Sequence, residues 1–315
     1  MLSRVAERIY WQARYLERAE NTARLLSVFS TLLLDLPPGT KLGWRSLVEI
    51  TGTDKVFAAK YKLANERNVM RFLLTDENSS SLMTTLAHTR ENARTTREIM
   101  PLEAFERIND LYHYARDNVA DSVSGGSRNK FLEEIISCCH EISGLMASSM
   151  SRGAAYSFVR LGRSLERADM ATRIIDVGSG NLLPDIGSGR KRQEAKEPYE
   201  NTLWMNILRS LTAYQMYRQH VKHRVNGEDV VRFLLQDDDF PRSATHALTT
   251  ITKVVNLLPN NVKAMKQVNK TLRMLQRANI NQLLEAGLFQ YVDDVQVEIA
   301  TIHGSIADTW FLPHS

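Results

Sequence analysis

Arginine and glutamate side chains recur in the same pattern at two distant places in this 315-residue chain. Residues 14–24 read RYLERAENTAR and residues 163–173 read RSLERADMATR, at an offset of 149 residues. Guanidinium and carboxylate groups form charge-assisted hydrogen bonds, and a guanidinium can also grip a carboxylate or phosphate ligand with two parallel bonds. Six side chains are candidates for this chemistry, and we call them the Glu–Arg cluster: Arg14, Glu17, Arg18, Arg163, Glu166 and Arg167.

The two motifs fall in segments with helical spacing. When residues are placed at 100° per residue, apolar side chains lie on the side that carries Glu17 and also on the opposite side. The same holds around Glu166. A helix that is apolar on both sides is usually buried on both sides. We therefore expect the Glu–Arg cluster to lie inside the protein.

Buried charges need partners, because an unpaired one costs several kcal/mol. Neighbouring Glu17 and Arg18 cannot face each other on a helix, whereas Glu17 can reach Arg14 one turn away. Arg18 and Arg167 must then find partners elsewhere. In one interpretation the two motifs form a structural ladder of ion pairs between the two halves. In the other, the arginines line a pocket for a small carboxylate or phosphate.

Two further matches follow the first in the same order along the chain. VMRFLL at residues 69–74 returns as VVRFLL at residues 230–235, an offset of 161, and Trp44 returns as Trp204, an offset of 160. Ordered matches of this kind indicate an internal duplication. We therefore predict two copies of one helical unit, packed as pseudo-symmetric repeats.

Composition favours an all-α fold. The chain has only 15 Gly and 8 Pro, few for a protein rich in hairpins, and residues 3–35 run without either. We predict a helical bundle that forms a single domain, residues 1–315, made of repeats at about 1–150 and 151–315. The stretch at about 178–198 is rich in Gly, Pro and charge, which predicts a flexible loop.

Other chemistry-bearing residues give weaker signals. The acidic runs Asp76–Glu77 and Asp237–Asp239 follow helical segments, where we expect them to cap the next helix. His220 and His223 lie on one helix face without further ligands at metal-binding spacing. The adjacent pair Cys138–Cys139 sits in an apolar run that predicts packing. We therefore expect no metal site, and the absence of a glycine-rich phosphate motif predicts no cofactor.

The segment LSRVAERIYWQARYLERAENTARLL and its echo GRSLERADMATRIID resemble the bacterial alpha-E family, a helical domain named for this Glu–Arg signature. The resemblance continues through RFLLTDEN, RENAR at 90–94, RFLLQDDDFPRS and ADTWFL, so it covers essentially the whole chain. RENAR has no clear counterpart in HALTTITKVVN at 246–256. Members of the family are typically encoded beside a circularly permuted ATP-grasp protein and a transglutaminase-like protein. The resemblance therefore implies a role in a system that forms or processes peptide or amide bonds.

Charge and hydropathy exclude several classes of partner. Lys and Arg number 40 against 36 Asp and Glu, without the clustered basic face of a nucleic-acid-binding protein. The most apolar stretch, residues 25–36, is shorter than the roughly 20 residues that a membrane span needs. The two cysteines make no disulfide framework, which favours a cytoplasmic location.

We expect a non-catalytic helical partner or scaffold that binds an ATP-grasp-type or transglutaminase-like protein. The alternative is an enzyme or binding protein for a small carboxylate or phosphate at the Glu–Arg cluster.

Overall fold

The computed structural model describes residues 2–35, 43–182 and 200–312. These ranges contain helices and no strand, as predicted from composition. The helices of the first part are α1 (Ser3–Asp35), α2 (Trp44–Ile50), α3 (Asp54–Lys60), α4 (Glu66–Leu74), α5 (Leu82–Thr95), the 3-10 turn η1 (Arg97–Ile99), α6 (Leu102–Ser124) and α7 (Arg128–Ser149). Those of the second part are α8 (Ala154–Leu182), α9 (Glu200–Ser210), α10 (Tyr214–His220), α11 (Gly227–Gln236), α12 (Ala244–Val255), α13 (Val262–Arg277), α14 (Ile280–Ala286) and α15 (Leu288–Trp310).

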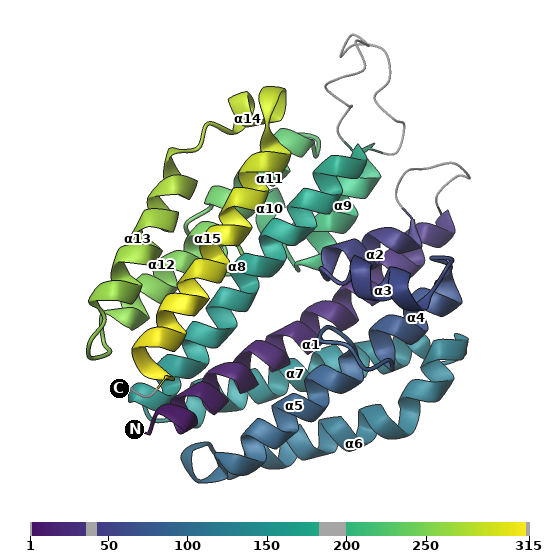
Figure 1. The fold of residues 1–315 in the computed structure, drawn as a ribbon. Helices are drawn as coiled ribbons and strands as arrows, with labels where there is room; N and C mark the ends of the chain where they lie inside the picture. The colour runs from purple at the N-terminus through teal and green to yellow at the C-terminus, as the bar shows by residue number, and fades with distance from the viewer. Residues whose placement is uncertain (1, 36–42, 183–199, 313–315) are drawn as a thin grey trace.

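The two longest helices, α1 and α8, pack against each other in the middle of the molecule (Figure 1). Their closest approach is at Gly162, where a Cβ atom would lie 2.3 Å from the carbonyl oxygen of Tyr10. Only a residue without a side chain allows this crossing. Because α1 and α8 carry the two Glu–Arg motifs, the crossing brings the motifs together.

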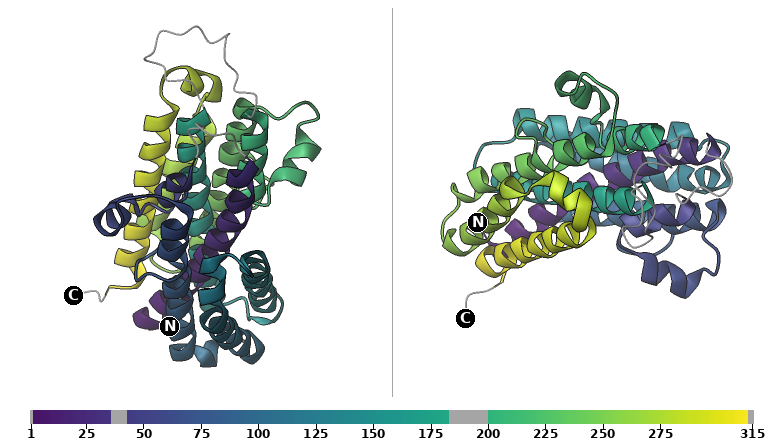
Figure 2. Two further views of the ribbon diagram at one scale, coloured as in Figure 1. Left: turned by 90° about the vertical axis from the view of Figure 1, so that its right-hand side faces the viewer. Right: turned by 90° about the horizontal axis from the view of Figure 1, so that it is seen from above.

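Longer helices cover the central pair on its two sides. Helices α5 and α7 pack against α1, and α6 packs across both of them. Helices α12 and α15 pack against α8, and α13 packs across both of those. Figures 1 and 2 show the two groups on opposite sides of the central pair, with the two ends of the chain close together. As expected for a helix that is apolar on both sides, α1 is buried around most of its surface.

The short helices α2 and α9 each contact both central helices. Trp204 of α9 is fully buried, and Trp44 of α2 is half-buried. Each of these two helices is followed by a residue with positive φ, Gly52 at +68° after α2 and Thr212 at +54° after α9. One short helix from each part of the chain therefore contacts the central pair.

Side-chain caps begin the helices that follow. Asn65 and Asn226 accept hydrogen bonds from the backbone N–H three residues later, at the starts of α4 and α11. Ser81 and Ser243 do the same at the starts of α5 and α12. Such caps satisfy backbone groups that the first helical turn leaves without partners. The Ser81 and Ser243 caps fix the residues at which the preceding loops end and α5 and α12 begin.

Backbone breaks separate two pairs of helices: α9 and α10 are divided at Thr212, which has positive φ, and α13 and α14 are divided between Arg277 and Ile280. One predicted boundary is wrong. The predicted loop begins later than residue 178, because α8 continues to Leu182. Gly178 does not end the helix but lies against α9, where a Cβ would be 2.5 Å from Ile207. Residues 183–198 of that loop lie outside the described residues.

Within the described ranges, no helix combines the length and the apolar character that crossing a membrane requires.

Candidate functional site

Glu166 of α8 receives two arginines from α1. Arg14 donates from Nε to Oε2 at 2.8 Å. Arg18 donates from Nε to Oε1 at 2.6 Å and from Nη2 to Oε2 at 3.1 Å, the bidentate arrangement that a planar guanidinium favours. The Glu166 side chain is only 2% exposed. Both of its oxygens are therefore used inside the protein.

Glu17 of α1 receives arginines from the second part of the chain. Arg167 of α8 donates from Nε to Oε1 at 2.7 Å, and Nη1 of Arg242 lies 2.9 Å from the same oxygen. The motifs thus exchange partners, with Arg18 on Glu166 and Arg167 on Glu17. Arg14 also reaches across to Glu166, although helical spacing alone suggested Glu17 of its own helix.

Burial and pairing act in opposite directions on these carboxyl groups. Burial alone would raise the pKa of Glu166, but the charges and hydrogen bonds of Arg18 and Arg14 outweigh it and lower the pKa to about 2. Burial likewise opposes ionisation of Glu20, whereas Arg242, His140 and Arg24 hold its pKa well below the usual range. The carboxylates are charged throughout the physiological pH range.

Arg242, which the sequence motifs did not point to, is central to the site. It donates from Nη2 to Glu20 at 2.5 Å and from Nη1 to Asn21 at 2.8 Å, and its side chain is 8% exposed. It directly precedes the capping residue Ser243, so the start of α12 places it over α1. The corresponding residue before the cap of α5 is Ser80, so Arg242 takes no part in the repeated pattern of the sequence.

Arginines outnumber carboxylates in this region. Arg24 pairs with Glu20 at 2.8 Å, and Arg173 pairs with Asp169 at 2.9 Å, each one helical turn apart. We call the whole set the extended cluster. Its arginines are Arg14, Arg18, Arg24, Arg163, Arg167, Arg173 and Arg242, and its carboxylates are Glu17, Glu20, Glu166 and Asp169.

A family model named Alpha-E, described as "a predicted alpha-helical domain with a conserved ER motif", matches residues 1–311. The chain belongs to the Alpha-E family. Neither a curated protein nor a solved structure matches it. The resemblance noted in the sequence is thereby confirmed over essentially the whole chain. In this Alpha-E domain, two Glu-Arg dipeptides, Glu17-Arg18 and Glu166-Arg167, face each other across the central helices.

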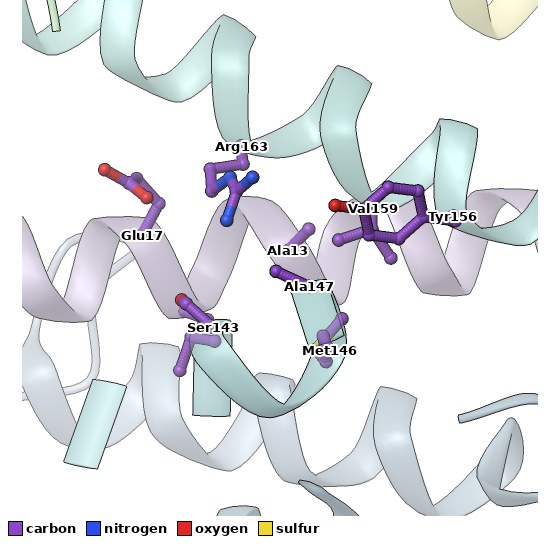
Figure 3. Close-up of a pocket in the computed structure, with 9 residues that line it drawn as sticks. Ala13, Glu17, Ser143, Met146, Ala147, Tyr156, Val159 and Arg163 are labelled. Atoms are coloured by element: carbon purple, nitrogen blue, oxygen red, sulfur yellow. The ribbon is translucent and has the colours of Figure 1, made fainter. Parts of the chain in front are cut away.

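Arg163 differs from the other arginines of the Alpha-E domain, because it forms no hydrogen bond or ion pair among the described residues. Burial, together with the charge of Arg167, lowers its pKa. Figure 3 shows its side chain extending from α8 over α1, beside Glu17. The pocket there has a free volume of about 10 Å³, which is room for one water molecule. The arginines that pair with Glu17 are Arg167 and Arg242.

A larger pocket lies on the other side of the motifs in the Alpha-E domain, with a volume of about 230 Å³. It opens between α1, α8, the end of α2 and the loop before α5. Its lining is mostly polar and consists of Arg18, Thr22, Thr51, Gly52, Ser79, Ser80, Glu166, Asp169, Met170 and Arg173.

Aromatic side chains close one end of the cluster. The Tyr10 hydroxyl lies 2.9 Å from Nδ1 of His303, and the two rings stack with centroids 5.7 Å apart. The guanidinium of Arg14 lies over the ring of Trp11, 5.0 Å from its centroid. Burial and the charge of Arg14 lower the pKa of His303 to about 4. His303 is therefore neutral at physiological pH and adds no second positive charge beside Arg14, whose carboxylate partner is Glu166.

The weaker candidates of the sequence do not join this site. Ser81 and Ser243, not the acidic runs, cap α5 and α12. Asp237 instead accepts from the N–H of Phe240 at 2.6 Å, and Asp76 accepts from the hydroxyl of Tyr61 at 2.7 Å. A carboxylate next to a loop bonds to groups of that loop as readily as it caps the helix that follows.

The histidines and cysteines of the weaker candidates also have local partners. His220 and His223 each lie within hydrogen-bond distance of a backbone carbonyl. Burial raises the pKa of both cysteines, with Cys138 at about 12, and both pack in the core. The described ranges hold no group of three or more side chains able to ligate a metal.

Proposed function

We propose that this chain is a helical scaffold whose reciprocal Glu–Arg pairs fasten α1 to α8. The observation that supports it is the exchange of partners, with Arg18 held by Glu166 and Arg167 held by Glu17. A buried pair is costly to break, because the remaining charge stays without a partner. The pairs thereby specify one alignment of the two central helices.

The same geometry favours a structural over a catalytic role for the cluster. A general acid or base works best with a pKa near the working pH and with an oxygen free to meet substrate. Glu166 has a pKa of about 2, and both of its oxygens accept hydrogen bonds from arginines. Arg14, Arg18 and Arg167 are engaged in the same pairs, which weighs against the alternative of a ligand held by the Glu–Arg cluster itself.

We further propose that the scaffold is a duplicated unit, with repeats at about residues 1–150 and 151–315. Five correspondences support this. Helices α1 and α8 carry the LERA motifs, α2 and α9 carry Trp44 and Trp204, and α4 and α11 begin at asparagine caps. Helices α5 and α12 both begin at serine caps. The packing of α5, α6 and α7 around α1 resembles that of α12, α13 and α15 around α8.

As the function of this scaffold, we propose that it binds an enzyme of a system that forms or processes peptide or amide bonds. The gene neighbours that the family resemblance implies, an ATP-grasp-type protein and a transglutaminase-like protein, are the proposed partners. We propose the cytoplasm as the location of this assembly, because ATP-dependent bond formation takes place there.

Co-expression tests the partnership. The chain is produced with a tag together with an ATP-grasp-type protein of the kind that the family resemblance implies, and the mixture is run on size-exclusion chromatography at micromolar concentration. Co-elution in a fixed ratio is the expected result. Separate elution of both proteins, each folded, contradicts the proposed partnership. An unrelated helical protein with the same tag is the control.

A further inference from the structure

We propose that the 230 Å³ pocket beside Arg18 and Arg173 binds one small oxyanion, a carboxylate or a phosphate. This site goes beyond the proposed scaffold role, because it uses groups that the Glu–Arg pairs leave free. It lies between the central helices and two loops, the end of α2 and the residues just before α5. A pocket of this volume has room for an inorganic phosphate or a small organic acid.

The pocket is lined by hydrogen-bond donors that have no acceptor, or only a distant one, among the described residues. Arg173 donates from Nε to Asp169 at 2.9 Å, and within the described residues its two terminal nitrogens form no hydrogen bond. The Thr22 hydroxyl is fully buried and also has no partner there. Arg18 adds Nη1, whose bond to the Ser79 carbonyl is long at 3.3 Å. A guanidinium with two free nitrogens matches the two oxygens of an oxyanion.

The turn after α2 makes room for the Arg173 guanidinium. Gly52 has φ of +68°, a backbone conformation that favours glycine. A Cβ atom on Gly52 would lie 2.3 Å from Nη1 of Arg173, so the guanidinium lies directly against the turn. With Nε fixed by Asp169, the terminal nitrogens are held at the pocket before any ligand arrives. Such preorganisation lowers the entropic cost of binding.

The free groups of the pocket favour an anion over a cation. Its lining has two arginines, Arg18 and Arg173, and two carboxylates, Glu166 and Asp169. Glu166 has no oxygen left for a cationic ligand because Arg14 and Arg18 occupy both. The terminal nitrogens of Arg173 can only donate hydrogen bonds, so their partner must be an acceptor such as an oxyanion.

The difference between the two capped loops explains why one site is expected and not two. Ser80 and Arg242 each directly precede the serine that caps the following helix. Arg242 extends its guanidinium to Glu17 and Glu20 and fills the space beside α1. Ser80 is short, and its hydroxyl donates to the Thr51 carbonyl at 3.3 Å. The space that an arginine would fill beside α8 is the pocket.

Calorimetric titration of the isolated chain tests the site, with sodium phosphate and sodium acetate in separate arms and sodium chloride at matched ionic strength as the blank. We expect one binding site per chain for phosphate or acetate, and the arm that binds identifies the class of ligand. We expect Arg173→Gln to weaken this binding roughly tenfold or more, since charge-assisted hydrogen bonds are lost. The matched control is Arg94→Gln, which removes an exposed arginine paired one turn away with Glu91 and should leave the affinity unchanged.

A second variant fills the pocket. Ser80→Leu places an apolar side chain in the pocket without adding charge, and we expect it to abolish anion binding while the thermal midpoint is retained. Absence of binding in both arms, or an unchanged affinity in Arg173→Gln, overturns the proposal. The titration uses the isolated chain, so a negative result counts against the anion site and not against the proposed ATP-grasp-type partner. Co-elution tests that partner separately.

Discussion

Each glutamate of the Glu–Arg cluster pairs with two arginines. Removing Glu166 leaves both Arg14 and Arg18 without a carboxylate, and removing Glu17 leaves Arg167 without one, whereas Arg242 keeps Glu20. Glu166 serves Arg14 and Arg18, and Glu17 serves Arg167 and Arg242. Exposed pairs on the same protein, such as Glu91 with Arg94, have water as an alternative partner for each charge. The cost of losing a carboxylate should therefore differ sharply between the two settings.

We expect Glu166→Gln and Glu17→Gln each to lower the free energy of unfolding by about 3–5 kcal/mol, because the shape is kept while buried arginines lose their counter-charge. This is a large share of the roughly 5–15 kcal/mol that stabilises a typical domain. The measurement is the denaturant midpoint and slope at pH 7. The control Glu91→Gln should leave the midpoint unchanged. Unchanged midpoints in both cluster variants would show that these pairs do not hold the fold.

The loss in Glu166→Gln should depend on pH with a defined sign. The folded-state pKa of about 2 lies below the ordinary glutamate value of 4.5, so the unfolded chain binds the proton first as pH falls. The stabilisation by Glu166 is complete above about pH 4.5 and is lost as the pH drops toward 2. The difference in unfolding free energy between wild type and variant therefore narrows over this acid window, which denaturant melts at a series of pH values measure.

The sequence predicted the site residues whose motif occurs twice. It did not predict the residues that reach the site only through tertiary packing. The duplicated motif pointed to Glu17, Arg18 and their counterparts, because charges that recur on a buried helix need partners of opposite sign. Arg242 and His303 carry no such signal. Arg242 reaches the cluster from the loop before α12, and His303 reaches it from α15, so both depend on the packing of the second part.

At the scale of elements, the crossing of α1 and α8 depends on one backbone contact. Gly162 of α8 lies against the Tyr10 carbonyl, and a rigid carbonyl cannot move aside as a flexible side chain can. The central helices must separate to admit even a methyl group, which also lengthens the Glu–Arg pairs on either side.

We expect Gly162→Ala to lower stability by about 1–3 kcal/mol, the usual cost of overpacking a well-packed interior. Gly144→Ala in α7 is the matched control, since a Cβ there meets nothing within 4 Å. Replacing a helical glycine with alanine in open space should raise stability by roughly 0.5–1 kcal/mol. Thermal or chemical melts of both variants separate the two effects, and equal shifts in the same direction would contradict the close crossing.

Elements with strong sequence punctuation were predicted well, and those broken by backbone geometry were not. The Pro-Pro-Gly stop after α1 and the serine before α5 mark their boundaries in the sequence. Thr212 is a β-branched residue that adopts positive φ, which local propensity disfavours. The sequence therefore did not predict the break between α9 and α10. Gly178 had the opposite effect. It predicted the start of a loop, whereas in the structure it lies inside α8 and close against Ile207 of α9.

On the scale of the whole molecule, neither part of the chain contains all the partners of its own central helix. Arg14 and Arg18 of α1 find their carboxylate on α8, and α2 and α9 each lie against both central helices. The fold class was predictable from composition and the ordered motifs. Ion pairs between the two motifs were one of the two interpretations of the sequence. Which arginine meets which glutamate was not predictable, because the sequence does not give the crossing of α1 and α8.

We expect residues 1–150 and 151–315, expressed as separate chains, to fail to fold cooperatively when alone, because each exposes a central helix with charges lacking partners. Expressed together, they should associate into one complex that melts as a unit. Circular dichroism melts and co-purification of a single tag measure both outcomes. A cooperative melt of the isolated 1–150 chain would contradict this dependence.

The exchange of partners between α1 and α8 also has a consequence for how such a sequence can change over generations. A motif that occurs twice in one chain is usually free to change at one place, since the other can retain the original role. Here a substitution at Arg18 is felt at Glu166, and one at Arg167 is felt at Glu17. Neither motif can be released from selection while the other is kept. Compensating substitutions should therefore arise in the opposite motif, some 150 positions away, rather than among neighbours in the sequence.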